Sequence, residues 1–440
     1  MKKLLNFIYS KKVDGVYTIT TIFGIKITTT PIRLQLRYIL DDIKYIQDNI
    51  NNIVKHQDRN LLVFYSKNIM DLIKYQKNKY DTYIHTYIQN NKKIMHSMQI
   101  NEDISNTYLI AKLFKNNFIY FNIHHTKIDA VLIFGLLTFP ENIINIQIAI
   151  YMNIPIFIFE DGFISALSTW ANNSLDKKYI EKICFTFSNL PHYFSGEITT
   201  LEYMLNDNKL KLTKEQIDRS KKLINYIIEN KITKYNHQPI YKPNIGTYNR
   251  KKILVVDQSY GDMSIAYGNA NEETFKNMLK KAIDDNPNCD ILIKTHPDTL
   301  VKNSQRPLGY FSKDDIKENV YLLQEEINPI SILEIVDKVY IVSSQLGFEA
   351  LMMGKEVHVF GIPFYSGYGL TIDYQKCERR TNKRTLEEMF FITYIMYSYY
   401  VNPLKEEQCE IEDAIDYLIK LRKEYFLEFN IRCDDEKLLK

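Results

Sequence analysis

Residues 339–360 read VYIVSSQLGFEALMMGKEVHVF, and this stretch decides the fold. Two short apolar runs, at 339–342 and 357–360, enclose a helical pattern at 345–353 that stops at Gly354. Continuous apolar runs of this length are typical of strands that are buried on both faces of a parallel sheet. The stretch therefore predicts a strand–helix–strand unit of an α/β domain.

The same alternation extends toward the N-terminus. Between this unit and residue 250, the sequence predicts strands at 252–257 and 290–294 and helices at 271–284 and around 331–336. Before residue 240, it predicts strands at 61–65, 130–135 and 155–159, with a helix at 142–151. A capping box from Thr213 to Gln216 opens another helix that ends near Lys231.

Residues 237–250 contain two prolines and a glycine without periodicity, so we expect a domain boundary there. Two α/β units joined by such a linker predict twin Rossmann-like domains that face a cleft. We expect a leader at 1–60, a first domain at 61–240, a second at 250–385 and a helical tail at 386–440. The leader combines a hairpin around Phe23-Gly24 with an amphipathic helix at 33–56.

The composition excludes several classes of protein. With 56 Lys and Arg against 53 Asp and Glu, there is no electrostatic case for nucleic-acid binding. Five scattered cysteines without CxxC spacing argue against a disulfide framework or structural zinc and favour reduced thiols in the cytoplasm. No run reaches the roughly 18 apolar residues of a spanning helix, so any membrane contact would be peripheral.

The positive charge is concentrated in the leader, where residues 1–60 carry ten Lys and Arg against five Asp and Glu. A solvated helix packed on its own domain explains this surplus. A contact of residues 1–56 with a partner or with an anionic inner-membrane surface explains it equally well.

Adjacent carboxylates follow the strand at 155–159. Glu160 and Asp161 come at its carboxyl end, where open α/β sheets bind ligands, and Gly162 permits a tight exit and close approach of a substrate. Because successive strand residues point to opposite faces, we expect only one of the two carboxylates to enter the cleft. The alternative is an acidic turn that caps a helix.

Three further features follow strands of the second domain. Lys294 and His296 end the strand at 290–294 and suit an anionic ligand. Ser343 and Ser344 precede a helix, as a phosphate cradle or as a helix cap. The glycine-punctuated loop 361–370 is either a lid over the cleft or a long turn.

Together these features place a carboxylate in one domain and an anion cradle in the other, which is the division of labour of a sugar-nucleotide glycosyltransferase. The sequence has no DxD motif and no cluster of His and Asp ligands, so we expect no metal. A leaving group with little charge, such as a nucleoside monophosphate, fits best. The GxGxxG, Walker A and GxSxG motifs are absent as well.

The motifs resemble those of the capsule-polysaccharide β-Kdo transferases, which are two-domain enzymes of the GT-B type in Gram-negative bacteria. The resemblance covers about residues 130–425. It rests on EDGFIS (160–165), ITKYN (232–236), the spacing of Gln258, Asp262 and Ser264, IKTHPD (293–298), the block 343–371, Arg379-Arg380 and YVNP (400–403).

The resemblance implies a metal-free, retaining transferase without a cofactor that moves Kdo from CMP-Kdo to a capsule or lipopolysaccharide acceptor, either an oligosaccharide or a lipid-linked saccharide. It implies that Asp161 attacks the anomeric carbon beside Glu160. It also implies roles for further residues. Lys294 and His296 would hold the phosphate or the Kdo carboxylate, Ser343 and Ser344 would hold the phosphate, and Glu349 would bind the ribose. Gln258 would face the cleft, whose shape would depend on Gly162, Gly347, Tyr365 and Gly367.

The chain departs from the family pattern at two points. Ile164 stands directly before Ser165 where the family has a bulky residue and Arg, and Thr295 replaces the usual Pro before His296. These departures leave the acceptor and the linkage open. An inverting sialyltransferase, with the carboxylate as general base, and a non-catalytic polysaccharide-assembly subunit remain alternatives.

Overall fold

A computed structural model describes most of the chain from residue 129 onward and a few strands before it. The described residues are 9–14, 17–22, 25–29, 94–96, 118–120, 129–135, 149, 154–169, 172, 174–189, 192–195, 198–300 and 308–439. The strand expected at 61–65, the helix expected at 33–56 and all but one residue of the helix expected at 142–151 lie outside these ranges.

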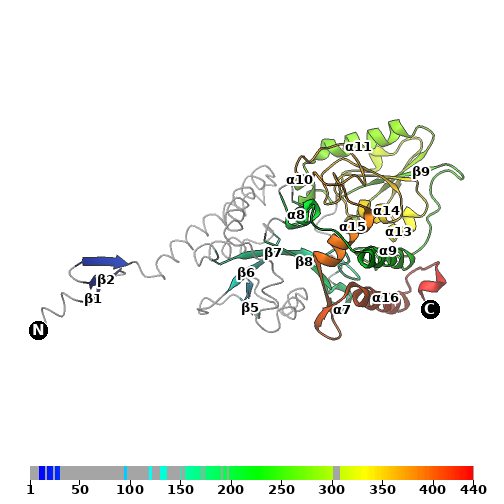
Figure 1. Ribbon diagram of the computed structural model, residues 1–440. Helices are drawn as coiled ribbons and strands as arrows, with labels where there is room; N and C mark the ends of the chain where they lie inside the picture. The colour runs from blue at the N-terminus through cyan, green and yellow to red at the C-terminus, as the bar shows by residue number, and fades with distance from the viewer. Residues whose placement is uncertain are drawn as a thin grey trace, which may run out of the picture.

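A fully parallel, six-stranded sheet forms the second half of the protein (Figure 1). Its strand order is β11-β10-β9-β12-β13-β14. The strands are β9 (Lys252–Val256), β10 (Asp290–Lys294), β11 (Val320–Leu323), β12 (Lys338–Ile341), β13 (Glu356–Val359) and β14 (Ile372–Asp373). This is the Rossmann order 3-2-1-4-5-6, in which ligands bind where the order reverses, here between β9 and β12. The α/β prediction is confirmed.

Helices cover both faces of this sheet, which explains why its strands are apolar throughout. They are α10 (Met263–Tyr267), α11 (Glu272–Asp285), α12 (Pro297–Leu300), α13 (Pro329–Leu333) and α14 (Leu346–Met352). In β9, Ile253 and Val255 pack in the same cluster as α11, whereas Leu254 and Val256 join the cluster that includes α13 and α14. Alternate residues of β9 thus pack into two different hydrophobic clusters, one on each face of the sheet.

The first sheet has seven strands, in the order β16-β15-β8-β7-β6-β4-β5. They are β4 (Ile94–His96), β5 (Phe118–Tyr120), β6 (Ala130–Phe134), β7 (Ile156–Asp161), β8 (Cys184–Ser188), β15 (Ser398–Asn402) and β16 (Glu407–Cys409). Strands β5, β4, β6 and β7 are parallel, while β8, β15 and β16 pair antiparallel. The carboxyl end of β7 therefore carries Glu160 and Asp161, as expected.

The tail is not entirely helical, so that part of the prediction is wrong. It begins with α15 (Leu386–Phe390), continues as a π-helical turn at Phe391–Met396, and then contributes β15 and β16 to the first sheet. The aromatic and β-branched run SYYVN is a good strand sequence, but it follows a helical pattern without a break. The long helix α16 (Ile411–Glu428) and the short helix Glu436–Leu438 follow.

Among the residues described, the first half also has three helices: α7 (Lys177–Ile180), α8 (Thr200–Asn206) and α9 (Lys214–Glu229). The capping box at Thr213 and Gln216 is confirmed at the start of α9. In Figure 1, α9 and α16 lie side by side. Arg219 of α9 contacts Glu410 and Glu412 at 2.7 Å each, which joins the tail to the first half.

The leader forms an antiparallel sheet of three strands, β1 (Tyr9–Asp14), β2 (Tyr17–Ile22) and β3 (Ile25–Thr29). The predicted hairpin around Phe23-Gly24 is confirmed by the pairing of β2 with β3. The strand β1, whose sequence YSKKVD has two adjacent lysines, was not predicted.

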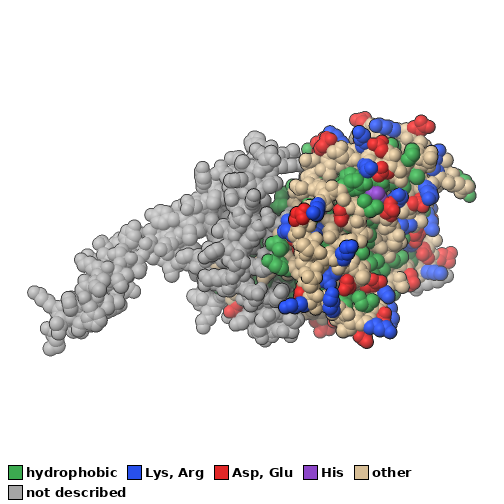
Figure 2. Space-filling model, turned by 45° about the horizontal axis from the view of Figure 1, so that its top comes forward, with side chains coloured by type: hydrophobic (Ala, Val, Ile, Leu, Met, Phe, Trp, Pro, Cys, Tyr) green, Lys and Arg blue, Asp and Glu red, His purple; other side chains and the backbone are tan. Residues whose placement is uncertain are grey.

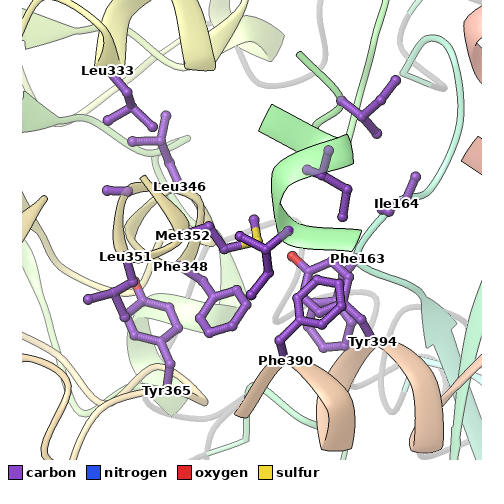
Figure 3. Packing of buried hydrophobic residues seen from close by; sticks show 14 of the residues in the cluster. Phe163, Ile164, Leu333, Leu346, Phe348, Leu351, Met352, Tyr365, Phe390 and Tyr394 are labelled. Carbon is purple, nitrogen blue, oxygen red and sulfur yellow. The ribbon is translucent and has the colours of Figure 1, made fainter. Parts of the chain in front are cut away.

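Phe163 lies at the junction of the two halves, two residues after Asp161. Figure 3 shows it beside Phe390 and Tyr394, with Phe348 of α14 facing it. Its ring centroid lies 4.9 Å from that of Phe364 and 5.1 Å from that of Tyr394. One continuous hydrophobic cluster thus contains residues of both sheets and of the tail, so the two halves share one core.

On the face shown in Figure 2, basic and acidic side chains are interspersed over the described part of the surface. Among the residues whose placement is described, no helix is both long and apolar enough to cross a bilayer.

We expect Phe163→Ala to destabilise the protein by about 3–5 kcal/mol, because the substitution opens a cavity at a fully buried site. The matched control is Leu427→Ala on α16, where the side chain is 67% exposed, with an expected change of under about 0.5 kcal/mol. Urea unfolding followed by circular dichroism measures both. Equal midpoints for the two variants would contradict the role of Phe163.

Candidate active site

Asp161 is the last residue of β7, and one of its oxygens is paired with a buried lysine. Oδ2 lies 3.0 Å from Nζ of Lys182, whose side chain is 1% exposed, whereas that of Asp161 is 16% exposed. Within the described part of the chain, Oδ1 of Asp161 is buried without a hydrogen-bond partner. The carboxylate thus has one paired and one unpaired oxygen.

Glu160 differs from its neighbour in its proton affinity. Burial, and then the charge of Asp161, raise the pKa of Glu160 to about 8, against the opposing charge of Lys234. A third, weaker contribution in the same direction comes from Asp262, at the start of α10 in the second half. At neutral pH, Glu160 is therefore mostly protonated and can donate a proton.

Both carboxylates act electrostatically on the same neighbours, and the expectation that only one of them enters the cleft stays a prediction. Burial lowers the pKa of Lys234, but the charges of Tyr193, Tyr235, Asp161 and Glu160 outweigh it and raise that pKa. Burial raises the pKa of Tyr193 to about 12, and the two carboxylates add to the rise. The pair shares one charged cluster at the carboxyl end of β7.

Gly162 is required for packing against the next strand. A Cβ atom there would lie 2.0 Å from Sγ of Cys184, and the Gly162 N–H donates to the Cys184 carbonyl at 2.8 Å. The sequence predicted that Gly162 permits a tight exit from the strand and the close approach of a substrate. The contacts described for it are with β8.

The segment 232–236 joins the two halves. The Lys234 N–H donates to Oε1 of Glu349 on α14 at 3.3 Å. The side chain of Asn236 fixes the segment, because it accepts from the Thr233 N–H at 2.9 Å and donates to the Ala166 carbonyl at 3.1 Å. Lys234 was not among the predicted site residues, although it lies within the ITKYN motif. Lys182 lies in no motif at all.

The switch point between β9 and β12 brings Gln258 and Ser343 together. The Ser343 N–H donates to Oε1 of Gln258 at 2.9 Å, and Nε2 of Gln258 donates to Oγ of Ser343 at 3.1 Å. Oγ of Ser264, on α10, lies 3.3 Å from Oγ of Ser343. These neutral hydroxyl and amide groups occupy the crevice where Rossmann sheets bind nucleotides.

Ser344 lies in the turn before α14 but is not its N-cap, so the capping alternative is wrong for this residue. Its Oγ accepts from the Leu346 N–H at 3.3 Å, and its carbonyl accepts from the Tyr365 hydroxyl at 2.6 Å. Gly347 makes room for that ring, because a Cβ atom there would lie 2.1 Å from the Tyr365 oxygen. Gln345 leaves the helix uncapped and instead donates to the Phe163 carbonyl at 2.8 Å, across the junction of the two halves.

Lys294 ends β10 and His296 follows it, and the two have different surroundings. Burial lowers the pKa of Lys294 to about 8, against the charges of Glu349 and Glu326. Nδ1 of His296 lies 3.0 Å from Oγ of Ser259, in the loop after β9. His296 thus lies beside that loop, while Lys294 is buried.

Glu349 lies inside the junction of the two halves. Burial raises its pKa to about 7, against the lowering effects of the Lys234 N–H and of the Lys234 and Lys294 charges. The described partner of Glu349 is a backbone amide, and its role toward ribose stays a prediction.

The loop 361–370 is a packed turn. Tyr365 and Tyr368 are fully buried, and the Arg380 guanidinium donates to the Ser366 carbonyl at 2.8 Å. Gly367 has φ of +80° and donates its N–H to Asp373 at 2.9 Å. Of the two alternatives, the structure therefore favours the long turn over the lid.

No group of three or more His, Cys, Asp or Glu side chains that could hold a metal ion occurs among the residues described. The chemical groups of the site are thus two carboxylates, buried lysines, a histidine and hydroxyls.

Two Rossmann-like units that meet at the ends of β7, β9 and β12 define the architecture of a GT-B-like glycosyltransferase. The model of the family described as capsule polysaccharide biosynthesis protein matches residues 129–405, so the chain belongs to that family. It is 38% identical over 219 residues to the capsule polysaccharide modification protein LipA of Neisseria meningitidis, and 31% identical over 269 residues to the lipopolysaccharide-processing protein LpsZ of Rhizobium meliloti.

These alignments cover only part of each relative. They span 48% of this chain and 30% of LipA, and 61% of this chain and 59% of LpsZ. Among solved structures, the beta Kdo 2,4 transferase KpsC of Thermosulfurimonas dismutans is similar, with 31% identity, a TM-score of 0.66, and coverage of 74% of this chain and 98% of that one. The beta Kdo 2,7 transferase of the same protein, at 22% identity and a TM-score of 0.54, supports the fold alone.

We expect Tyr365→Phe to lower the free energy of unfolding by about 1–3 kcal/mol, because the buried Ser344 carbonyl loses its hydroxyl donor. The control is Tyr248→Phe, at a site that is 90% exposed, with an expected change near zero. Chemical denaturation of the two variants measures the difference. A Tyr365→Phe protein as stable as the wild type would contradict this account of the turn before α14.

Proposed function

We propose that the protein transfers Kdo from CMP-Kdo to a bacterial surface-polysaccharide acceptor, with retention at the anomeric carbon. The observation that carries the proposal is the carboxylate pair at the end of β7, which lies across the junction from the Gln258–Ser343 crevice. Similarity to the beta Kdo 2,4 transferase KpsC supports the choice of sugar.

The donor fits the crevice by its charge. Gln258, Ser264 and Ser343 offer neutral donors to a phosphate, with His296 beside them. A phosphate monoester needs less neutralisation than a diphosphate, because it carries one phosphoryl group in place of two. The sequence contains no set of metal ligands for this site. Cytidine monophosphate as the leaving group is consistent with such a site.

The reaction proceeds in two displacements at C2 of Kdo. In the first, a carboxylate oxygen of Asp161 bonds to C2 while the bond from C2 to the phosphate oxygen breaks, and its electron pair leaves with CMP. In the second, a hydroxyl oxygen of the acceptor bonds to C2 while the bond to Asp161 breaks. Two inversions give net retention.

Glu160 moves the proton that these steps require. With a pKa raised to about 8, it is protonated when the donor binds and can give its proton to the departing phosphate oxygen. The resulting carboxylate then takes the proton of the acceptor hydroxyl. Two carboxylates of different proton affinity thus serve two roles.

The acceptor and the location belong to the same proposal. A lipid-linked saccharide at the inner face of the cytoplasmic membrane would bring the enzyme close to anionic lipids. The basic surplus of the leader, ten Lys and Arg against five Asp and Glu in residues 1–60, suits such a surface.

We expect Asp161→Asn to lower turnover of CMP-Kdo by about 10³-fold or more, because the amide cannot displace CMP. The control is Asp284→Asn, on the exposed side of α11, with unchanged turnover. Release of CMP in the presence of acceptor measures both. Wild-type turnover in Asp161→Asn would contradict the assignment of the nucleophile.

The anomeric configuration of the product separates the proposed reaction from its alternatives. NMR of the product made from CMP-β-Kdo shows a β linkage if the reaction retains configuration. An inverted linkage instead favours a single displacement with a carboxylate as general base. A chain that neither binds CMP in a thermal-shift assay nor turns over CMP-Kdo is a non-catalytic assembly subunit.

We expect the kcat of the wild type to fall as the pH rises through about 8, since the form of Glu160 that acts first is protonated. Glu160→Gln should lose this basic limb and retain low activity. Glu273→Gln, on the exposed start of α11, is the control. A basic limb that persists unchanged in Glu160→Gln would assign it to another group.

A further inference from the structure

We propose that Lys182 is the positioning residue of the attacking carboxylate: its ammonium holds Oδ2 of Asp161, so that Oδ1 is the oxygen that bonds to the sugar. This inference rests on the proposed function. It adds a residue that no sequence motif contains and that the comparisons do not identify.

The geometry defines which oxygen is held and which is open. Nζ of Lys182 forms an ion pair with Oδ2 at 3.0 Å, without a hydrogen bond of good geometry, while Oδ1 is without a hydrogen-bond partner in the described part of the protein. A buried carboxylate oxygen left unpaired is costly unless a ligand uses it. Oδ1 is therefore the oxygen available to an electrophilic carbon.

The main chain fixes Lys182 from both sides. The next residue, Ile183, donates its N–H to the Ser165 carbonyl at 2.9 Å and accepts from the Val401 N–H at 2.9 Å. The segment is thus tied to the strand exit after β7 and to β15 of the tail. A lysine on a backbone held in this way has little freedom to swing away from Asp161.

The surroundings keep Lys182 charged. Burial lowers its pKa, but the charges of Asp161 and Tyr235 and the hydrogen bond to Asp161 outweigh this effect and leave the pKa raised. Nζ also lies 4.7 Å from the centroid of the Tyr235 ring. A buried ammonium with these partners is a permanent charge at neutral pH.

Other charged and titratable groups face the same carboxylate pair. Glu160 precedes Asp161 on β7, Tyr193 approaches from the segment after β8, and Lys234 approaches from the segment 232–236. Lys234 also influences Asp161, but it is linked to Glu349 through its backbone. Among these groups, only Lys182 lies within ion-pair distance of Asp161.

The charge of Lys182 has opposite effects on the two steps. It stabilises the carboxylate that attacks in the first step. When the Oδ1–C2 bond has formed and CMP has left, Asp161 is a neutral ester and the ammonium has lost its anionic partner. The ammonium then favours the second step, in which the C2–Oδ1 bond breaks and the electron pair returns to the carboxylate.

The test compares Lys182→Met, Lys182→Gln and Lys182→Arg in the full chain, with CMP-Kdo and acceptor. We expect Lys182→Met to lower kcat at pH 7 by about tenfold or more. KM for CMP-Kdo should change by less than about twofold, because Lys182 acts on the attacking carboxylate and not on donor binding. Lys182→Arg should restore most of the lost kcat. Lys178→Met, on α7 with a half-exposed ion pair to Glu424, is the matched control.

If the Met variant does not fold, Lys182→Gln provides the test instead, because its amide is a donor to Oδ2 without the positive charge. The CMP-induced thermal shift should be unchanged in each folded variant. A normal kcat in a folded, uncharged variant, with Asp161→Asn inactive, would overturn the role of Lys182 and leave the proposed function standing. Full activity of Asp161→Asn, or no wild-type turnover of CMP-Kdo, would overturn the proposed function together with this inference.

Discussion

The position of the carboxylate pair depends on the burial of Phe163. This residue follows the pair and Gly162, and its ring packs against Phe364 of the second half and Tyr394 of the tail. Its carbonyl accepts in addition from Gln345, at the start of α14. The strand that carries the carboxylates and the helix α14 are therefore anchored in one core. Relative movement of the two halves would have to break this apolar contact.

Around that core, buried charges compensate one another across the junction. Asp161 faces Lys182, and Glu349 faces the Lys234 amide and the Lys294 charge. Each group alone would be costly to bury, and truncation of one partner would leave the other uncompensated. The charge of Lys234 does not compensate the burial of Glu160 in full, so the pKa of Glu160 stays raised. A carboxylate with a raised pKa is typical of groups that transfer protons in catalysis. Packing and electrostatics thus impose the same arrangement of the two halves.

Periodicity was sufficient to predict the parallel sheet, because β9, β10 and β12 each contain a continuous apolar run. It placed Gln258 and Ser343 at strand ends, and the structure brings them into contact. It could not find Lys182, since a lysine before a strand has no pattern and its burial arises only when β7 and β8 pair. It also missed β15, whose strand partner lies far away in the sequence. Long-range pairing leaves little trace in local sequence.

The return of the tail to the first sheet makes the first half depend on a segment that is made after the second half. Ser398 pairs with Thr186, so the outer edge of β8 is open until β15 has been made. The described strands of the second sheet, by contrast, lie between Lys252 and Asp373 and precede β15 in the chain. They can therefore pair during synthesis while β8 still has an exposed strand edge, a site at which unfinished chains can associate.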